Sequence, residues 1–231
     1  MTRQKLSVRR QLRHRSVCVA ILLALVNGLG STFAWACREN AMIVFDASGS
    51  MALFRDGSSK IDVARKAAAD VLPDVTKYRP TGLVTYGGGK GPACTDVDLR
   101  VEPQVRSGGK ILAALDKIKP DGATPLSQGV RLATETLQRR DVPGVVVVVT
   151  DGLENCGGRT CELARKLKSQ ASNIRIHVIS FFLHGRRIDT LTCLTEATKG
   201  VYTSANSLES LRNALRELLS CQRISQLNVL Q

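Results

Sequence analysis

The stretch GVVVVVTDG, residues 144–152, decides the fold. Five consecutive valines follow a glycine, and the run ends abruptly in Thr150-Asp151-Gly152. β-Branched residues favour extended backbone, and an unbroken apolar run is typical of a strand buried on both faces of a parallel sheet. The sequence therefore predicts a central strand over residues 144–150.

Strand-like and helix-like segments alternate on both sides of this run. Further strands are predicted at 42–47, 82–87, 96–101, 175–183 and 200–204. Helices are predicted at 58–72, 109–118, 124–138, 160–169, 188–198 and 207–220. Only 82–87 and 96–101 lack room for a helix between them, so these two strands should form an antiparallel hairpin at one edge. The alternation predicts a doubly wound α/β sheet, in which ligands collect at the carboxyl ends of the strands.

The first 36 residues have the order of a secretory signal peptide. Six basic residues and no acidic residue are followed by an apolar run at 17–26 and then by Ala34-Trp35-Ala36. This run is short for a membrane span, which needs about twenty residues. We expect an exported protein, periplasmic or secreted, with no membrane span after cleavage. An uncleaved anchor over 17–36 is the alternative, and residues 222–231 are expected to form a short tail.

Charge and cysteine content narrow the function class further. The net charge is +13, but much of the excess lies in the predicted signal peptide, so no nucleic-acid partner is expected. Six cysteines follow position 36, and an even count in an exported chain predicts disulfides. A zinc site is not expected, because no C-x2-C pair occurs and His177 falls in a strand pattern, where a packed histidine is expected. The candidate disulfide cysteines are Cys37, Cys94, Cys156, Cys161, Cys193 and Cys221.

Oxygen-bearing side chains gather where the predicted strands end. In MIVFDASGSM, residues 42–51, the apolar run stops at Asp46, and Ser48 and Ser50 follow at spacings of two. Residues two apart project to the same side of an extended chain. Asp151 should lie at the same edge if its strand is a parallel neighbour of 42–47, and Thr124 is expected to cap the helix at 124–138. This donor set suits a hard divalent cation, Mg2+ first, with Mn2+ or Ca2+ as alternatives.

These residues and their order resemble the von Willebrand factor A domain with its metal-ion-dependent adhesion site. The resemblance covers about residues 40–220, places the domain at 37–221, and implies a Rossmann-like, mostly parallel α/β sheet with one antiparallel edge strand and helices on both faces. It implies that Ser48, Ser50 and Thr124 contact the metal directly, and that Asp46 and Asp151 act mostly through water. The run DGLENCGGRTC is similar to that of an exported bacterial subgroup.

The topology implied by this resemblance also constrains the cysteines. Cys37 and Cys221 should lie at the edge opposite the metal and tie the ends of the domain together. The other four fall near the metal-bearing edge. The simplest local closure is Cys156–Cys161 with Cys94–Cys193, and Cys94–Cys156 with Cys161–Cys193 is also possible.

Three functions follow from these patterns. The first is a non-enzymatic extracytoplasmic binding module that captures an exposed Asp or Glu of a protein partner through the bound divalent cation. The second is a Mg2+-dependent phosphoryl-transfer enzyme with Asp46 as nucleophile. That chemistry usually needs a second acid two residues later, where Ser48 stands, and a positioned lysine, and the sequence reveals neither. The third is a scaffold with a non-functional metal site.

Overall fold

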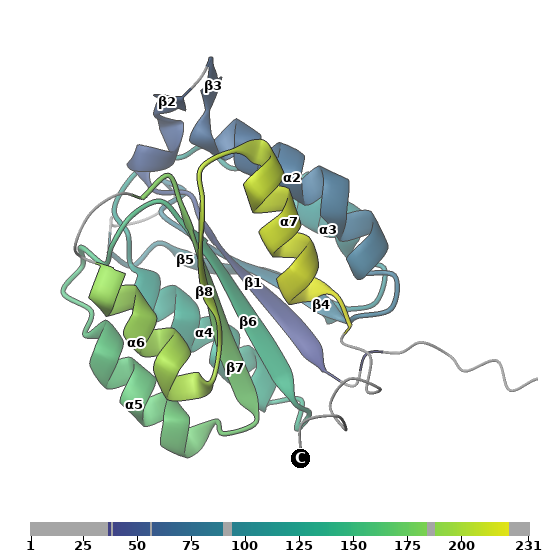
Figure 1. The fold of residues 1–231 in the computed structure, drawn as a ribbon, viewed down its shortest axis with the longest axis vertical. Helices are drawn as coiled ribbons and strands as arrows, with labels where there is room; N and C mark the ends of the chain where they lie inside the picture. The colour runs from purple at the N-terminus through teal and green to yellow at the C-terminus, as the bar shows by residue number, and fades with distance from the viewer. Residues whose placement is uncertain (1–36, 38, 56, 90–93, 184–187, 222–231) are drawn as a thin grey trace, which may run out of the picture. The chain divides into compact units, whose positions relative to one another are not determined.

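The computed structural model describes residues 37–221 except for 38, 56, 90–93 and 184–187 (Figure 1). The predicted signal peptide, residues 1–36, and the predicted tail, residues 222–231, lie outside the described residues.

A six-stranded sheet forms the centre of the domain, in the order β5-β4-β1-β6-β7-β8. The strands are β1 (Asn40–Asp46), β4 (Thr81–Tyr86), β5 (Val97–Gln104), β6 (Gly144–Thr150), β7 (Ile174–Phe181) and β8 (Tyr202–Ala205). All neighbours pair in parallel except β4 and β5, which form the antiparallel hairpin expected at the edge. The predicted fold class is therefore confirmed.

Helices cover both faces of this sheet (Figure 1). They are α2 (Lys60–Val75), α3 (Gly108–Asp116), α4 (Leu126–Gln138), α5 (Thr160–Gln170), α6 (Asp189–Thr198) and α7 (Leu208–Leu219). α2, α3 and α7 pack on one face, and α4, α5 and α6 pack on the other. The start of α7 is fixed by a capping box, in which Ser207 and Ser210 bond each other's backbone.

The two central strands alternate between the two hydrophobic cores. Ile43, Val147 and Val149 join the core beneath α2 and α7, whereas Val44 and Val148 join the core beneath α4 and α5. This burial on both faces is the reason for the unbroken apolar runs in the sequence. It also fixes the point at which β1 and β6 end, because neither strand can slip in register without moving its side chains to the wrong core.

Two short elements were not predicted from the sequence. A 3-10 helix, η1 (Gly49–Ala52), follows β1 directly, and a small hairpin pairs β2 (Phe54–Arg55) with β3 (Ser58–Ser59). Strands of two residues carry too few positions to show any hydrophobic periodicity. Together these elements connect the end of β1 to the start of α2.

Three disulfides link the six cysteines that follow position 36. Cys37–Cys221 is confirmed and joins the ends of the described domain. Of the two pairings left open for the other four, the simplest closure, Cys156–Cys161 with Cys94–Cys193, is wrong, and the alternative, Cys94–Cys156 with Cys161–Cys193, is confirmed. Cys161 lies on α5 and Cys193 lies on α6, and these two helices pack side by side. Helix packing therefore brings Cys161 to a partner that is distant in the sequence.

Among the described residues, none of the helices is both long enough and apolar enough to cross a membrane.

Candidate metal site at the carboxyl edge of the sheet

β1 and β6 bring the two predicted aspartates to one edge. The strands are parallel neighbours, and Phe45 pairs with Val149 in their register. The residues that follow this pair, Asp46 on β1 and Thr150-Asp151 on β6, therefore leave the sheet side by side. The expectation that Asp46 and Asp151 share an edge is thus confirmed by the strand pairing.

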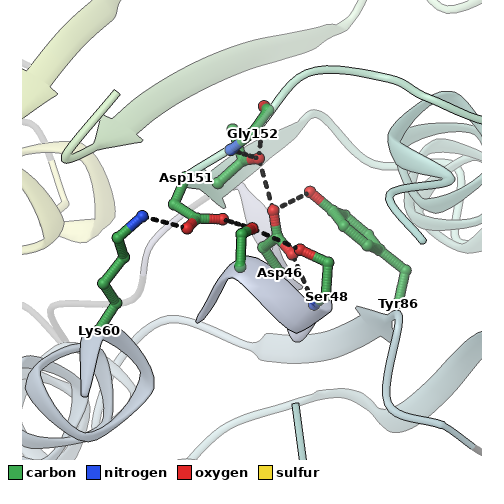
Figure 2. Close-up of polar contacts among 8 residues, drawn as sticks. Asp46, Ser48, Lys60, Tyr86, Asp151 and Gly152 are labelled. Carbon is green, nitrogen blue, oxygen red and sulfur yellow. Dashed lines mark hydrogen bonds and ion pairs between the residues drawn. The ribbon is translucent and has the colours of Figure 1, made fainter. Parts of the chain in front are cut away.

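The two serines point toward Asp151. Ser48 Oγ lies 3.1 Å from Ser50 Oγ, and Ser50 Oγ donates to Asp151 Oδ1 at 2.6 Å (Figure 2). Adjacent ligands of an octahedral Mg2+ stand about 3.0 Å apart when each metal–oxygen distance is about 2.1 Å. The spacing of the two hydroxyls therefore fits adjacent positions around such an ion. Ser50 and Gly152 are partly exposed, so the site reaches the surface there.

Asp46 is fully buried behind these serines and is held by neutral donors. Its Oδ1 accepts the Ser48 backbone N–H at 2.8 Å, and its Oδ2 accepts the Tyr86 hydroxyl at 3.0 Å and the Thr150 hydroxyl at 2.7 Å (Figure 2). Burial raises the pKa of Asp46, and the negative charge of Asp151 raises this pKa further, whereas the bonds from Ser48 and Thr150 lower it. Asp46 is thus positioned to shape the loop that carries the serines.

Tyr86 remains a hydrogen-bond donor in this setting. Burial raises the pKa of its phenol well above the usual value, and the nearby charge of Asp46 adds to the effect. An ionised phenolate could not donate to a carboxylate, so this shift preserves the bond to Asp46.

The loop that carries Thr124 is fastened to the loop that carries the serines. Gly49 N–H donates to Gly122 O at 3.1 Å, and Asp121 N–H donates to Ala47 O at 3.1 Å. The expected capping role of Thr124 is wrong, because α4 begins at Leu126 with Pro125 in the N-cap position and no side-chain cap. Proline fixes its own backbone angle, so the helix can start there without a hydroxyl acceptor.

The Thr124 side chain instead faces the other donors. Its backbone N–H donates to Asn155 Oδ1 at 2.7 Å, and among the described residues its hydroxyl has no hydrogen-bond partner. A Cβ added to Gly152 would lie 3.7 Å from Thr124 Oγ1 and 3.9 Å from Ser50 Oγ. Both hydroxyls therefore border the same small space beside Gly152, and any larger residue there would enter it.

Gly87 allows the loops to approach one another. Its φ is +73°, and an added Cβ would stand 2.6 Å from Ala123 O and 2.8 Å from Ser48 Cα. Both the backbone angle and the contact exclude a side chain. A glycine after β4 is therefore required for the segments carrying Ser48 and Thr124 to meet.

Lys60 belongs to the site and was missed in the sequence. It is the first residue of α2, and its Nζ donates to Asp151 Oδ2 at 2.6 Å with both side chains buried (Figure 2). A lysine in the first turn opposes the helix dipole, which favours acidic residues there. That local conflict was the available signal. No comparable signal marked Tyr86 or Asn155, whose roles depend on contacts between distant segments.

The donor set fits a hard divalent cation. Among the described residues, no group of three or more His, Cys, Asp or Glu side chains could hold a metal ion. The site offers two carboxylates and hydroxyl oxygens, which are the ligands that Mg2+ prefers and zinc does not. A cation held by Ser48, Ser50, Thr124 and the two aspartates would supply an electron-poor centre for an oxygen ligand.

Comparisons with known proteins bear on the fold of this chain. Residues 41–154 match the family model described as von Willebrand factor type A domain. The uncharacterized protein YwmD of Bacillus subtilis (strain 168) is 28% identical over 187 residues, which are 76% of this chain and 82% of that protein.

Two solved structures show the same fold at low sequence identity. A von Willebrand factor type A protein from Catenulispora acidiphila superposes with a TM-score of 0.63 at 18% identity, covering 79% of this chain and 42% of that chain. The pilus adhesin SpaC from Lactobacillus rhamnosus GG gives a TM-score of 0.63 at 14% identity, covering 79% of this chain and 30% of that chain. At these identities the likeness concerns the fold alone.

Proposed function

We propose, from the premise that this chain carries a von Willebrand factor type A domain, that it is a non-enzymatic, metal-dependent protein-binding module outside the cytoplasm. Asp46, Ser48, Ser50, Thr124 and Asp151 hold a divalent cation, with Mg2+ preferred over Mn2+ and Ca2+. An exposed Asp or Glu of a protein partner completes the coordination of that cation.

One observation carries this proposal. Ser48 Oγ, Ser50 Oγ and Asp151 Oδ1 form a chain of contacts of 3.1 Å and 2.6 Å, and backbone bonds fasten the loop after β1 to the loop between α3 and α4 that carries Thr124. An ordinary turn would satisfy these hydroxyls with nearby backbone groups. Here the hydroxyls lie beside one another and beside one carboxylate. This arrangement suits a cation, which is coordinated by several oxygen atoms at once.

The contacts of Asp46 weigh against the phosphoryl-transfer alternative. The structure does supply a positioned lysine, Lys60, contrary to the expectation from the sequence. Asp46, however, is fully buried, and hydrogen bonds from Ser48, Tyr86 and Thr150 engage both of its oxygens. A nucleophile must reach its substrate, and this carboxylate would first have to leave its bonds and the core.

Two further observations support a binding role outside the cytoplasm. Three disulfides are typical of proteins in oxidising compartments. The described fold is also that of proteins named as a pilus adhesin and as a minor pilin. We therefore include export, through the signal peptide predicted at residues 1–36, in the proposal.

A scaffold with a non-functional metal site is the second candidate. The Lys60–Asp151 ion pair favours it, because a buried lysine already compensates one aspartate in the absence of any metal. The two candidates differ in one property that can be measured. Only a working site responds to divalent cations through the Thr124 hydroxyl.

Thr124→Val provides the test, because it removes a hydroxyl that has no hydrogen-bond partner within the described part of the chain, and it keeps the shape of the side chain. Thermal unfolding of the oxidised domain is followed with Mg2+, with Mn2+ and with EDTA. A cation that binds only the folded state raises the midpoint according to its concentration relative to Kd. We expect a rise in the wild type that is lost in Thr124→Val, with equal midpoints in EDTA. Thr136→Val, on α4, is the matched control and keeps the rise.

The same proteins are then used to capture partners from the surroundings of the cell. Capture with Mg2+ present, lost with EDTA and in Thr124→Val, supports the binding module. An unfolding midpoint that does not change with millimolar Mg2+ or Mn2+, together with partner capture that EDTA does not affect, would refute metal dependence and favour the scaffold.

A further inference from the structure

Lys60 places a positive charge within the candidate metal site. Its Nζ lies 2.6 Å from Asp151 Oδ2, and the two side chains are 7% and 0% exposed. Salt screens buried charges far less than exposed ones, and charges interact more strongly where water is excluded. The charge of Lys60 is therefore felt by anything that binds beside Asp151.

Lys60 and the hydroxyl cluster use different oxygens of Asp151. Lys60 Nζ donates to Oδ2, whereas Oδ1 accepts the Ser50 hydroxyl (Figure 2). The lysine thus leaves the oxygen on the serine side available. Lys60 and a cation near Ser48 and Ser50 can share the carboxylate, so the two do not compete for one position.

The start of α2 does not depend on this ion pair. Ser59 caps the helix by accepting the Asp62 N–H, and the Lys60 N–H donates to Leu53 O at 3.0 Å. These backbone bonds hold the first turn regardless of where the lysine side chain points. The placement of Nζ against Asp151 is therefore not explained by the anchoring of the helix.

The consequence is a charge balance that favours an acidic ligand. The carboxylates of Asp46 and Asp151 would balance a divalent cation alone, but Lys60 adds one positive charge. We propose that Lys60 is a specificity-determining residue: it leaves the cation-loaded site with one excess positive charge. The cation then binds weakly alone and firmly only with a carboxylate. This inference rests on the proposed function and explains why an acidic group would be selected.

The test measures Mn2+ binding directly, by the electron paramagnetic resonance signal of free Mn2+. Wild type, Lys60→Met and Lys66→Met are titrated with Mn2+ in sodium acetate and in sodium chloride of equal ionic strength. Acetate supplies a carboxylate without a partner protein. Lys66 is exposed on the same helix, so Lys66→Met makes the same change in total charge away from the site.

We expect Lys60→Met to bind Mn2+ alone at least about tenfold more tightly than the wild type, because a nearby repelling charge is removed. Acetate should strengthen Mn2+ binding several-fold in the wild type and in Lys66→Met, and clearly less in Lys60→Met. Lys60→Gln is titrated in parallel and carries the same expectation if the methionine variant does not fold.

The other outcomes separate this inference from the function on which it rests. Mn2+ binding by the wild type, with equal or weaker binding by both Lys60 variants, overturns the inference and leaves the metal site intact. The inference is also overturned, with the metal site intact, if acetate strengthens Mn2+ binding equally in all variants. Binding by none of the proteins, with or without acetate, overturns the metal site itself. Binding only by the Lys60 variants would mean that the lysine replaces the cation, which refutes both.

Discussion

The Lys60–Asp151 ion pair predicts a strong and non-additive loss of stability when either charge is removed. Asp151→Asn keeps an oxygen for the Ser50 hydroxyl but leaves the Lys60 charge buried and uncompensated. Lys60→Met leaves Asp151 without the lysine that balances its charge. The negative charge of Asp151 already raises the pKa of Asp46. Removing one partner of a buried pair costs about 3–5 kcal/mol of unfolding free energy.

The double variant Lys60→Met/Asp151→Asn should recover most of this loss. Replacement of a whole buried pair by neutral groups is often close to neutral. We therefore expect each single variant to lower the free energy of unfolding by about 3–5 kcal/mol, and the double variant by much less than their sum. Each kilocalorie corresponds to about 2–4 °C in the unfolding midpoint for a domain of this size.

The assay is urea unfolding of the oxidised domain in EDTA, so that no metal contributes to the result. The matched control is the exposed pair Arg159–Glu162, whose side chains are 77% and 52% exposed. Arg159→Met and Glu162→Gln should each change stability by about 0.5 kcal/mol or less. Additive losses at Lys60 and Asp151, or losses as small as those of the control pair, would refute the buried ion pair.

Three further predictions concern other parts of the domain. Burial and the charges of nearby arginines lower the pKa of His177 to about 4 from 6.5, so the unfolded chain binds a proton between these values that the folded chain does not. Stability should therefore fall by up to about 3 kcal/mol as the pH drops through this window. His177 Nδ1 accepts the Val201 N–H at 3.0 Å, and His177→Asn keeps an acceptor there. This variant should remove the pH dependence of stability in urea unfolding at several pH values, and an unchanged dependence would contradict the prediction. Gly87→Ala should lower the free energy of unfolding by about 1–3 kcal/mol and abolish the midpoint rise with Mg2+, because its Cβ would collide with the loops of the site. Gly157→Ala, at a similar backbone angle in open space, is the control and should keep the rise. Equal responses of the two variants would refute the packing argument. Loss of the Cys94–Cys156 bond in a double serine variant should lower stability by about 4 kcal/mol, given its separation of 62 residues; an unchanged midpoint would show that the bond does not constrain the unfolded chain.

The sheet could be predicted well because the residue composition of each strand indicates how deeply that strand is buried. The valine run gives β6 the bounds predicted for it, 144–150. A strand buried on both faces needs apolar residues throughout, so its composition alone indicates its position. The edge hairpin followed from a short connection between 82–87 and 96–101, since no helix could fit between them. Local composition and spacing were sufficient for both features.

The rest depended on contacts between distant segments. Lys60 and Asp151 are 91 residues apart, and no pattern in either segment indicates that the two side chains form an ion pair. The pairing of Cys161 with Cys193 required knowing that α5 and α6 lie side by side. Thr124 was predicted both to cap its helix and to belong to the candidate site; the capping role is wrong because Pro125 is the N-cap of α4, and the bond from the Thr124 N–H to Asn155, far along the chain, could not be read from Thr-Pro. Tertiary contacts decided each of these against the local pattern.

The segment that follows Asp151 explains how Thr124 is held without a cap. Asn155 Oδ1 accepts the Thr124 N–H at 2.7 Å, and Glu154 Oε2 accepts the Ser127 N–H at 2.7 Å. The loop after β6 therefore bonds the backbone just before and just after the first residue of α4. The next residue, Cys156, is bonded to Cys94. A loop fixed at a disulfide and at two backbone groups loses little freedom when a ligand binds beside it, and a smaller ordering cost leaves more of the interaction energy for affinity. Cys94, Cys156 and the oxygen donors therefore belong to one structure, in which the disulfide stabilises the loop that positions Thr124 in the candidate site.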